Sequence, residues 1–267
     1  MRRDPTISAA EARIVEPLLA AYSSHWVQIS LFKDQLLAAL ATAPKLAPLI
    51  HSIRSRLKDA GQLRDKPCRK IRKSREQKTT FDIRPDNLLV KVNDLVGVRI
   101  LHLYTRQIRQ IDSALREIFA ESQYELLEGP FARTWDDESR QFFQVCKIST
   151  RDSPSLYTSV HYVIGSASGT KVTAEIQVRT LMEEVWGEVD HAMNYPQKAE
   201  SLACREQLKV LARVTPSATR LVDSIFLTLE DYQQQRERAP EQPQKSQRRA
   251  RGHPIAPGAA PRRPANR

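Results

Sequence analysis

The spacing of apolar positions changes between residues 174 and 195. Glu175, Gln177 and Arg179 alternate with Ile176 and Val178, which is the period of a strand with one charged and one apolar face. Residues 181–195 then take helical spacing, which separates apolar from polar side chains. The apolar face holds Met182, Trp186, Val189 and Met193, and the polar face holds Glu184, Glu188, His191 and Tyr195. Such a strand and helix are typical of a site wall, although an exposed surface has the same pattern.

The same kind of spacing predicts the other elements of the chain. We expect helices over 8–57 with a capping box at Ser8 to Glu11 and a break at Ala43-Pro44, then a charged, loop-like segment over 61–86. Strands are expected over 96–104, 141–148, 157–164 and 171–179, and further helices over 106–120, 181–195 and 204–232. The predicted fold class is therefore α/β (α+β), with a mixed β-sheet flanked by N- and C-terminal helices.

The C-terminal segment 233–267 differs from the rest in composition. It is rich in Gln, Pro, Arg and Ala, contains almost no large apolar residue, and is expected to be disordered. Its nine Lys and Arg against two Glu account for +7 of the formal net charge of +11, so the folded part is only mildly basic. A basic tail fits a weak contact with RNA or the ribosome, or a solubilising extension.

The cysteines and the search for targeting segments indicate the cellular compartment. Cys68, Cys146 and Cys204 form no CxxC pair, and their odd number favours a reducing compartment over a disulfide framework. We find no signal peptide and no apolar run long enough to span a membrane, so a cytoplasmic location without membrane contact is expected.

Two further segments carry polar residues inside predicted strands. Asp94 stands at the start of the strand over 96–104 and Arg99 inside it, where such residues need a partner or a ligand. Tyr157, Ser159 and His161 share one strand face, which suits base stacking and phosphate contact but also fits a half-exposed strand.

A pair of carboxylates and a basic segment suggest what these strands could bind. Asp94 and Glu175 together could hold Mg²⁺, which takes one or two carboxylates plus substrate phosphates. The basic run over 54–70 includes Arg56, Lys58 and Lys66, and this density of cations suits a polyphosphate. A solvated basic helix or an RNA-binding patch remains an alternative interpretation of that run.

Together the motifs resemble the synthetase domain of RelA/SpoT-type alarmone synthetases. In order, they are Arg56-x-Lys58 with Lys66, Asp94-Leu-Val-Gly-Val-Arg99, Tyr157-x-Ser-x-His161, and Glu175-x-Gln-Val-Arg-Thr180 before a helix with His191. The resemblance implies a nucleotidyltransferase-like synthetase domain over 45–200, preceded by a helical segment (1–44) and followed by a helix (201–232) and the basic tail (233–267). No histidine is followed by Asp, so the hydrolase domain of that family is not expected.

The resemblance also implies an activity and the residues that perform it. The β,γ-pyrophosphate of ATP would pass to the 3′-hydroxyl of GDP or GTP, giving ppGpp or pppGpp. Arg56 and Arg99 would sandwich the adenine, and Lys58 and Lys66 would hold the ATP phosphates. Asp94 and Glu175 would bind Mg²⁺, with Glu175 also able to take the hydroxyl proton. The acceptor side would be lined by Tyr157, Ser159, His161, Gln177, Arg179, Glu184 and His191, and small synthetases of this type are often homo-oligomers.

Three positions depart from the family pattern. Ser153 stands where relatives carry a phosphate-binding Lys, although Arg151 could substitute, Leu156 stands at a Gly position, and Glu184 replaces a common Asn. These changes leave open a different acceptor, the 3′ end of tRNA, which some toxic members of the family pyrophosphorylate. A noncatalytic RNA-binding protein is a second alternative. A ferritin-like di-iron site is disfavoured because Glu188-x-x-His191 has no second copy.

Overall fold

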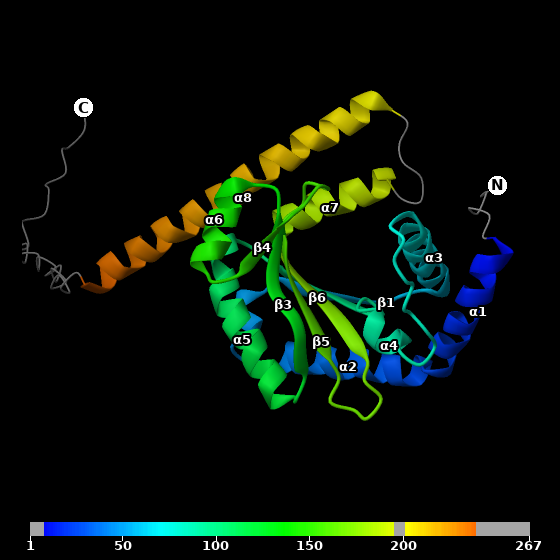
Figure 1. Cartoon of the computed structure of the whole chain (residues 1–267). Helices are drawn as coiled ribbons and strands as arrows, with labels where there is room; N and C mark the ends of the chain where they lie inside the picture. The colour runs from blue at the N-terminus through cyan, green and yellow to red at the C-terminus, as the bar shows by residue number, and fades with distance from the viewer. Residues whose placement is uncertain (1–7, 195–200, 239–267) are drawn as a thin grey trace, which may run out of the picture. The chain divides into compact units, whose positions relative to one another are not determined.

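The fold is built on one six-stranded mixed sheet (Figure 1). A computed structural model describes residues 8–194 and 201–238. The strands have the order β1-β2-β6-β5-β3-β4, with β2/β6 and β3/β4 parallel and the other neighbours antiparallel. Their bounds are β1 Ser52–Leu57, β2 Val96–His102, β3 Glu125–Thr134, β4 Ser149–Asp152, β5 Ser159–Gly165 and β6 Thr173–Thr180. The predicted α/β fold with a mixed sheet is confirmed.

Helices precede, follow and interrupt the strands. They are α1 Ala9–Ser24, α2 Trp26–Thr42, α3 Ala60–Glu76, α4 Leu88–Lys91, α5 Ile108–Glu121, α6 Asp137–Val145, α7 Leu181–Asn194 and α8 Leu202–Arg238. The predicted capping box begins α1, because Ser8 Oγ accepts the N–H of Glu11 at 3.2 Å and the Glu11 carboxylate accepts that of Ser8 at 3.0 Å. The predicted helices over 106–120, 181–195 and 204–232 correspond to α5, α7 and α8, while Tyr195 lies outside the described residues.

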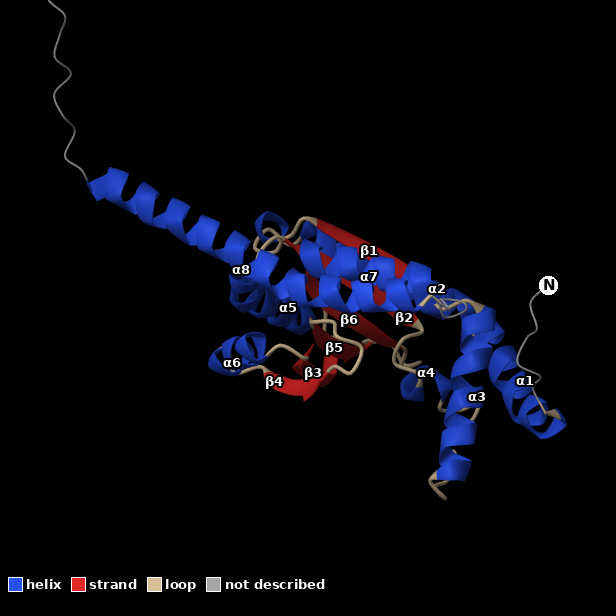
Figure 2. Ribbon diagram, turned by 90° about the horizontal axis from the view of Figure 1, so that it is seen from above, coloured by secondary structure: helices blue, strands red, loops and turns tan. Residues whose placement is uncertain are grey.

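The two faces of the sheet have opposite character. The apolar face includes Ile100, Tyr162 and Ile176, which are fully buried against the core that α2 and α5 help to form. Figures 1 and 2 show α7 on the other side of the sheet from α2. Each fully buried Leu or Ile side chain contributes roughly 1.5–3 kcal/mol, so the apolar face supplies the driving force for folding. The polar side chains of the other face are therefore available to contact ligands.

Two predictions near the N-terminus are wrong. Residues 52–57 are the edge strand β1 rather than a helix, because they pair antiparallel with β2, with Arg54 opposite Arg99 and Arg56 opposite Gly97. Much of 61–86 is the helix α3 rather than a loop. Its few apolar side chains, among them Ile71, pack against Val15 of α1, so tertiary burial outweighs the internal Pro67 and the high charge.

Two further differences concern the middle of the chain. Residues 137–145 form α6, where a strand was predicted, because Asp136 caps this helix by accepting the N–H of Ser139 at 2.8 Å. Strands β3 and β4 were not predicted at all. The Gly129-Pro130 pair interrupts the alternation of β3, and β4 has only four residues.

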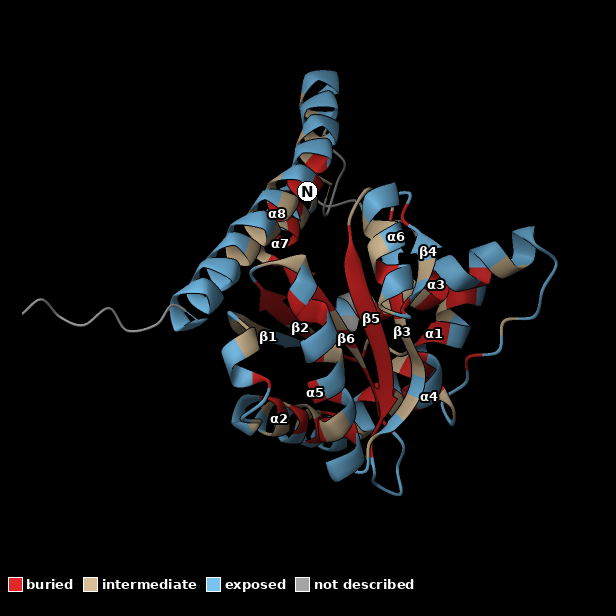
Figure 3. Cartoon of the chain, turned by 90° about the vertical axis from the view of Figure 1, so that its left-hand side faces the viewer, coloured by how far each residue is buried: buried red, intermediate tan, exposed pale blue. Residues whose placement is uncertain are grey.

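The chain divides into a compact unit up to Leu227 and a second unit from Thr228. The predicted N-terminal segment contributes α1 and α2 to the first unit, where Tyr22 donates its hydroxyl hydrogen bond to the backbone carbonyl of Lys58. Helix α8 extends to Arg238, so 233–238 of the predicted disordered tail are helical, and 239–267 lie outside the described residues. Figure 3 shows α8 as a largely exposed helix. Across the described ranges, every helix is too short or too polar to cross a membrane.

Candidate active site

Side chains from five strands form one row across the polar face. The strand register places Arg54 opposite Arg99, Arg99 opposite Gln177, Gln177 opposite His161, and His161 opposite Phe131. Directly paired residues project from the same face of a sheet, so Arg99 and Gln177, which are 78 residues apart in the sequence, become neighbours. The row leads from guanidinium groups at β1 and β2 to an imidazole and an aromatic ring at β5 and β3.

An open cavity of about 250 Å³ lies at the β1 and β2 end of this row. Among the residues that line it are Arg54, Arg56, Asp94, Arg99, Glu175, Gln177, Glu188 and His191. Gly97 also lines the cavity, and a Cβ atom there would make an ordinary van der Waals contact of 3.4 Å with Arg56 Cγ. The structure thus brings together the predicted ATP-binding arginines, both predicted magnesium ligands, and His191, which the resemblance assigns to the acceptor side.

Asp94 connects the two predicted phosphate-binding lysines. Its carboxylate lies 2.6 Å from Lys58 Nζ and also binds Lys66 Nζ. Lys58 follows β1, Lys66 lies on α3 and Asp94 precedes β2, so three separate elements meet here. Burial alone would raise the pKa of Asp94, but the charges and hydrogen bonds of Lys66 and Lys58 outweigh it and lower the pKa below 3.8. Asp94 is therefore ionised at neutral pH.

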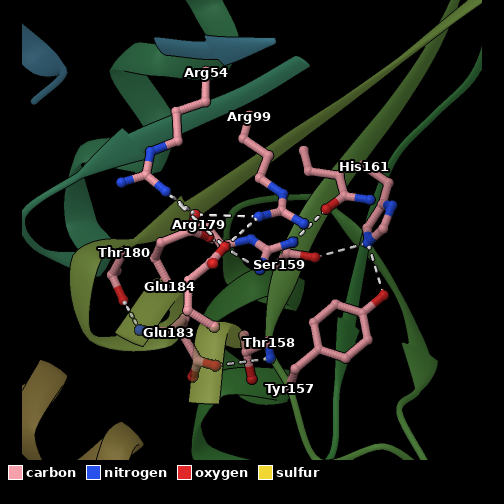
Figure 4. Close-up of polar contacts among 12 residues, drawn as sticks. Arg54, Arg99, Tyr157, Thr158, Ser159, His161, Arg179, Thr180, Glu183 and Glu184 are labelled. Atoms are coloured by element: carbon pink, nitrogen blue, oxygen red, sulfur yellow. Dashed lines mark hydrogen bonds and ion pairs between the residues drawn. The ribbon is translucent and has the colours of Figure 1, made fainter. Parts of the chain in front are cut away.

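Glu175 is held by a buried histidine, because His161 Nδ1 lies 2.8 Å from Glu175 Oε1. The Nε2 atom of His161 lies 2.7 Å from Ser159 Oγ and 3.3 Å from the Tyr157 hydroxyl (Figure 4). Burial lowers the pKa of His161 below 6.5. Burial would raise the pKa of Glu175, but the hydrogen bond from His161 outweighs it and lowers that pKa. These directions favour a neutral imidazole that donates from Nδ1 to an ionised Glu175 and accepts at Nε2.

Glu184 lies between three arginines from three strands (Figure 4). Its carboxylate oxygens are 3.4 Å from Arg54 Nη1, 3.2 Å from Arg99 Nη1 and 3.2 Å from Arg179 Nη1. The side chain is only 6% exposed, so Glu184 orders the guanidinium groups instead of offering an open contact surface. Glu188, one turn further, adds a 2.9 Å ion pair to Arg99, and Gln177 accepts a hydrogen bond from Arg179 Nη2. The acceptor roles of Glu184, Gln177 and Arg179 remain predictions.

Glu183 is a buried residue of this region that the sequence patterns did not reveal. Its carboxylate accepts the backbone N–H of Thr158 at 3.0 Å, next to the predicted base-stacking Tyr157. Burial raises the pKa of Glu183 to about 7. Helical spacing places Glu183 on neither of the two stripes of α7, so periodicity carries no signal for it. Trp186, predicted only as a core residue, lies parallel to the Tyr157 ring with centroids 6.5 Å apart.

The fold and the site define an α/β protein whose sheet face gathers cations and two carboxylates around one cavity, an arrangement suited to a phosphate-bearing ligand. Residues 55–200 match the region found in RelA/SpoT proteins. Because this match covers more than half of the sequence, the chain belongs to the RelA/SpoT family. Every predicted site residue lies within the matched region.

Solved structures share this fold. The Bacillus subtilis small alarmone synthetase 1 bound to its product pppGpp has a TM-score of 0.56 and 18% identity, covering 78% of this chain and 98% of its own. The same synthetase bound to AMPCPP has a TM-score of 0.53 and 16% identity, covering 79% and 99%. A GTP pyrophosphokinase family protein from Streptococcus pneumoniae has a TM-score of 0.52 and 16% identity, covering 85% and 97%. No curated protein matches the sequence.

Proposed function

We propose that the protein is a pyrophosphokinase that transfers the β,γ-pyrophosphate of ATP to the 3′-hydroxyl of GDP or GTP. The observation that carries this proposal is the position of Glu175. It lines the cavity with Arg56, Arg99 and Asp94, and it is hydrogen-bonded to His161, which in turn contacts Ser159 and Tyr157. A carboxylate between a cationic pocket and an aromatic, hydroxyl-bearing surface is suited to take a proton from the hydroxyl of one nucleotide bound next to another. Membership of the RelA/SpoT family supports the same reaction class.

The cationic end of the site is proposed to bind ATP. Arg56 and Arg99 lie on neighbouring strands, where their planar guanidinium groups can enclose the adenine. Lys58 and Lys66 both contact the Asp94 carboxylate. Phosphates bound beside Asp94 would therefore lie within reach of both lysines, which can turn from the carboxylate to the phosphates. Nucleotide binding here therefore exchanges ion pairs within the protein for ion pairs with the substrate.

The residues present fit a magnesium ion that arrives with ATP. Asp94 and Glu175 line the same cavity, and Mg²⁺ commonly takes one or two carboxylates together with substrate phosphates. Within residues 8–194 and 201–238 no three or more His, Cys, Asp or Glu side chains form a ready-made metal site. Binding should therefore depend on the nucleotide. The ion would supply neutralisation of charge on the phosphate oxygens.

In the proposed reaction, Glu175 takes the proton of the acceptor 3′-hydroxyl. The 3′-oxygen forms a bond to the β-phosphorus of ATP, and the bond between that phosphorus and the α,β-bridging oxygen breaks, releasing AMP. His161 holds Glu175 by its 2.8 Å hydrogen bond, so the base keeps one orientation. Catalysis of this type is mostly positioning and charge neutralisation, which the row of fixed side chains can provide.

One observation favours a second candidate acceptor, the 3′ end of tRNA. Ser153 stands at the position of the family's phosphate-binding Lys, and it is 3% exposed with its hydroxyl accepting the backbone N–H of Tyr157 at 3.3 Å. This position offers no cation to a free nucleotide. A noncatalytic RNA-binding role is less consistent with the site, since Asp94 and Glu175 would repel a phosphate backbone.

The experiment that tests the proposal incubates purified protein with ATP labelled in the β,γ-phosphates, Mg²⁺ and one acceptor at a time. We expect label on GDP and GTP, and none with the Glu175→Gln variant. Label on deacylated tRNA alone would replace the proposed acceptor with the second candidate. Folded protein that transfers label to none of the three acceptors would refute the proposed activity.

A further inference from the structure

The long helix α8 contacts the elements around Tyr157, the predicted base-stacking residue. Its residues 202–227 belong to the first compact unit, where Figure 1 shows them passing α7 and α6. All 37 residues of α8 lie in the described part of the chain, and the buried ones are Ala212, Thr215, Pro216 and Thr219. With so little apolar surface buried, individual polar contacts carry more of the docking of α8.

The first of these contacts is made through Trp186 on α7. Its indole Nε1 donates a hydrogen bond to the backbone carbonyl of Leu208 on α8 at 3.3 Å. The side chain of Trp186 is buried, and its ring lies nearly parallel to the Tyr157 ring, with the planes at 9°. Helix α8 therefore restrains the indole that faces the Tyr157 ring.

The second contact leads to the residue after Tyr157. Arg220 on α8 forms a 3.0 Å ion pair with Asp136, the N-cap residue of α6. The backbone N–H of Asp136 donates to Thr134 Oγ1 at 3.3 Å, and this fully buried Oγ1 lies 3.0 Å from Thr158 Oγ1. A continuous series of polar contacts thus connects α8 to the Tyr157–Thr158 segment.

The Tyr157–Thr158 segment depends on side-chain contacts because it lies outside the sheet. β4 ends at Asp152 and β5 begins only at Ser159, so strand pairing does not fix the residues between them. Thr158 is held instead by its hydroxyl contact with Thr134 and by Glu183, which accepts its backbone N–H at 3.0 Å (Figure 4). A change at the end of β3 should therefore move Tyr157.

A small polar cavity is lined by residues of both α8 and this segment. Its volume is about 30 Å³, and its walls include Thr158 and Glu183 on one side and Thr219 and Arg220 of α8 on the other. Helix and segment do not pack tightly against each other across such a space. Their connection runs through the polar side chains around it, of which Arg220 carries the charge that reaches Asp136.

We propose that α8 positions Tyr157 for the acceptor nucleotide, with Arg220 and Trp186 as the positioning residues. This role rests on the proposed function, because it takes Tyr157 to stack on the acceptor base. The contacts described above involve no residue that lines the cavity proposed for ATP. Loosening α8 should therefore weaken acceptor binding and leave ATP binding unchanged, whereas a helix that only stabilises the fold would affect both nucleotides alike.

The test compares GDP and ATP in full-length wild type, Arg220→Gln, Asp136→Asn and the double variant. Asn caps a helix about as well as Asp, so Asp136→Asn removes only the charge. Each single variant should raise the KM for GDP, and the GDP dissociation constant from titration, by about threefold, as expected for a partly exposed ion pair. The KM for ATP should not change. The double variant should be no weaker than either single one, because both changes break one contact.

Three further variants test the route of this effect. Arg220→Lys keeps the positive charge and should restore most of the GDP affinity. Glu138→Gln removes the other ion pair of Arg220, at 2.9 Å, which lies outside the route to Thr158, and it should match the wild type. Trp186→Phe keeps a ring beside Tyr157 but loses the N–H donor to α8, and it should raise the KM for GDP and not the KM for ATP.

The outcomes separate the role of α8 from the proposed function. Equal KM values for GDP in wild type and Arg220→Gln would overturn the role and leave the proposed function intact. A parallel rise in the KM for GDP and for ATP, or additive effects of Arg220→Gln and Asp136→Asn, would also overturn it. Wild-type protein that binds GDP without transferring pyrophosphate would contradict the proposed function alone, because the titrated GDP affinities still decide the role of α8. Wild-type protein that binds no GDP would refute both.

Discussion

The buried carboxyl of Glu183 should make the stability of this protein depend on pH. Its side chain is buried beneath the Tyr157–Thr158 segment and accepts one backbone N–H, from Thr158 at 3.0 Å. Burial raises its pKa from 4.5 to about 7, with the nearby Asp136 adding to the rise and Arg179 opposing it. The perturbation we propose is Glu183→Gln, which keeps a carbonyl oxygen for Thr158 and removes the titration.

The sign and size of the effect on the free energy of unfolding follow from the pKa of Glu183 in the unfolded chain and in the folded protein. Between pH 4.5 and about 7 the folded protein retains a proton that the unfolded chain has released. The contribution of protonated Glu183 to the free energy of unfolding is therefore fully present below pH 4.5 and is lost as the pH rises through about 7. Each pH unit in this window lowers the free energy of unfolding by about 1.4 kcal/mol, so the total is about 3 kcal/mol. Glu183→Gln should gain about this amount relative to the wild type between pH 4.5 and pH 8.

The assay is urea unfolding of both proteins at several pH values across this range. Only the difference between variant and wild type is interpreted, because other groups titrate equally in both. Glu121→Gln, an exposed carboxylate on α5, is the control and should follow the wild type. Parallel pH dependence in the wild type and Glu183→Gln would refute the reasoning, since it would show that Glu183 has the same pKa in the folded and unfolded chains.

Three further predictions concern the site and its support. Glu175→Gln should abolish pyrophosphate transfer while ATP binding, measured by titration, stays within about threefold of wild type; normal turnover would exclude the proposed base. Glu184→Ala should lower the free energy of unfolding by about 3–5 kcal/mol, because Arg179, only 7% exposed, loses its buried carboxylate; a loss below about 1 kcal/mol by urea unfolding would show that water replaces the carboxylate. Gly129→Ala should destabilise by more than about 1 kcal/mol, since its φ is +100° and a Cβ would lie 2.4 Å from the His161 carbonyl oxygen. Gly169→Ala, whose Cβ would meet nothing within 4 Å, is the thermal-unfolding control and should match wild type.

Local patterns predicted the site where one strand carries several of its residues. The alternation over 174–180 indicated the charged face of β6. The period of two grouped Tyr157 with Ser159 and His161, and His161 contacts the other two at 3.3 and 2.7 Å, although β5 begins only at Ser159 and Tyr157 lies in the loop before it. Sparse or interrupted patterns led to wrong predictions. The helix α3 has few apolar side chains, and β3 contains Gly129-Pro130, so in both cases packing against distant elements outweighs local propensity.

The sequence by itself determined which side chains could share a strand face or a helix face, because those periods follow from backbone geometry alone. It also determined the order of the motifs, all of which lie within residues 55–200, the region that matches the RelA/SpoT family. Only the tertiary structure decided that β6, the last strand in the sequence, lies between β2 and β5. That insertion depends on burying the apolar face of the whole sheet against α2 and α5, a long-range condition that no local pattern encodes. It places Glu175 beside His161.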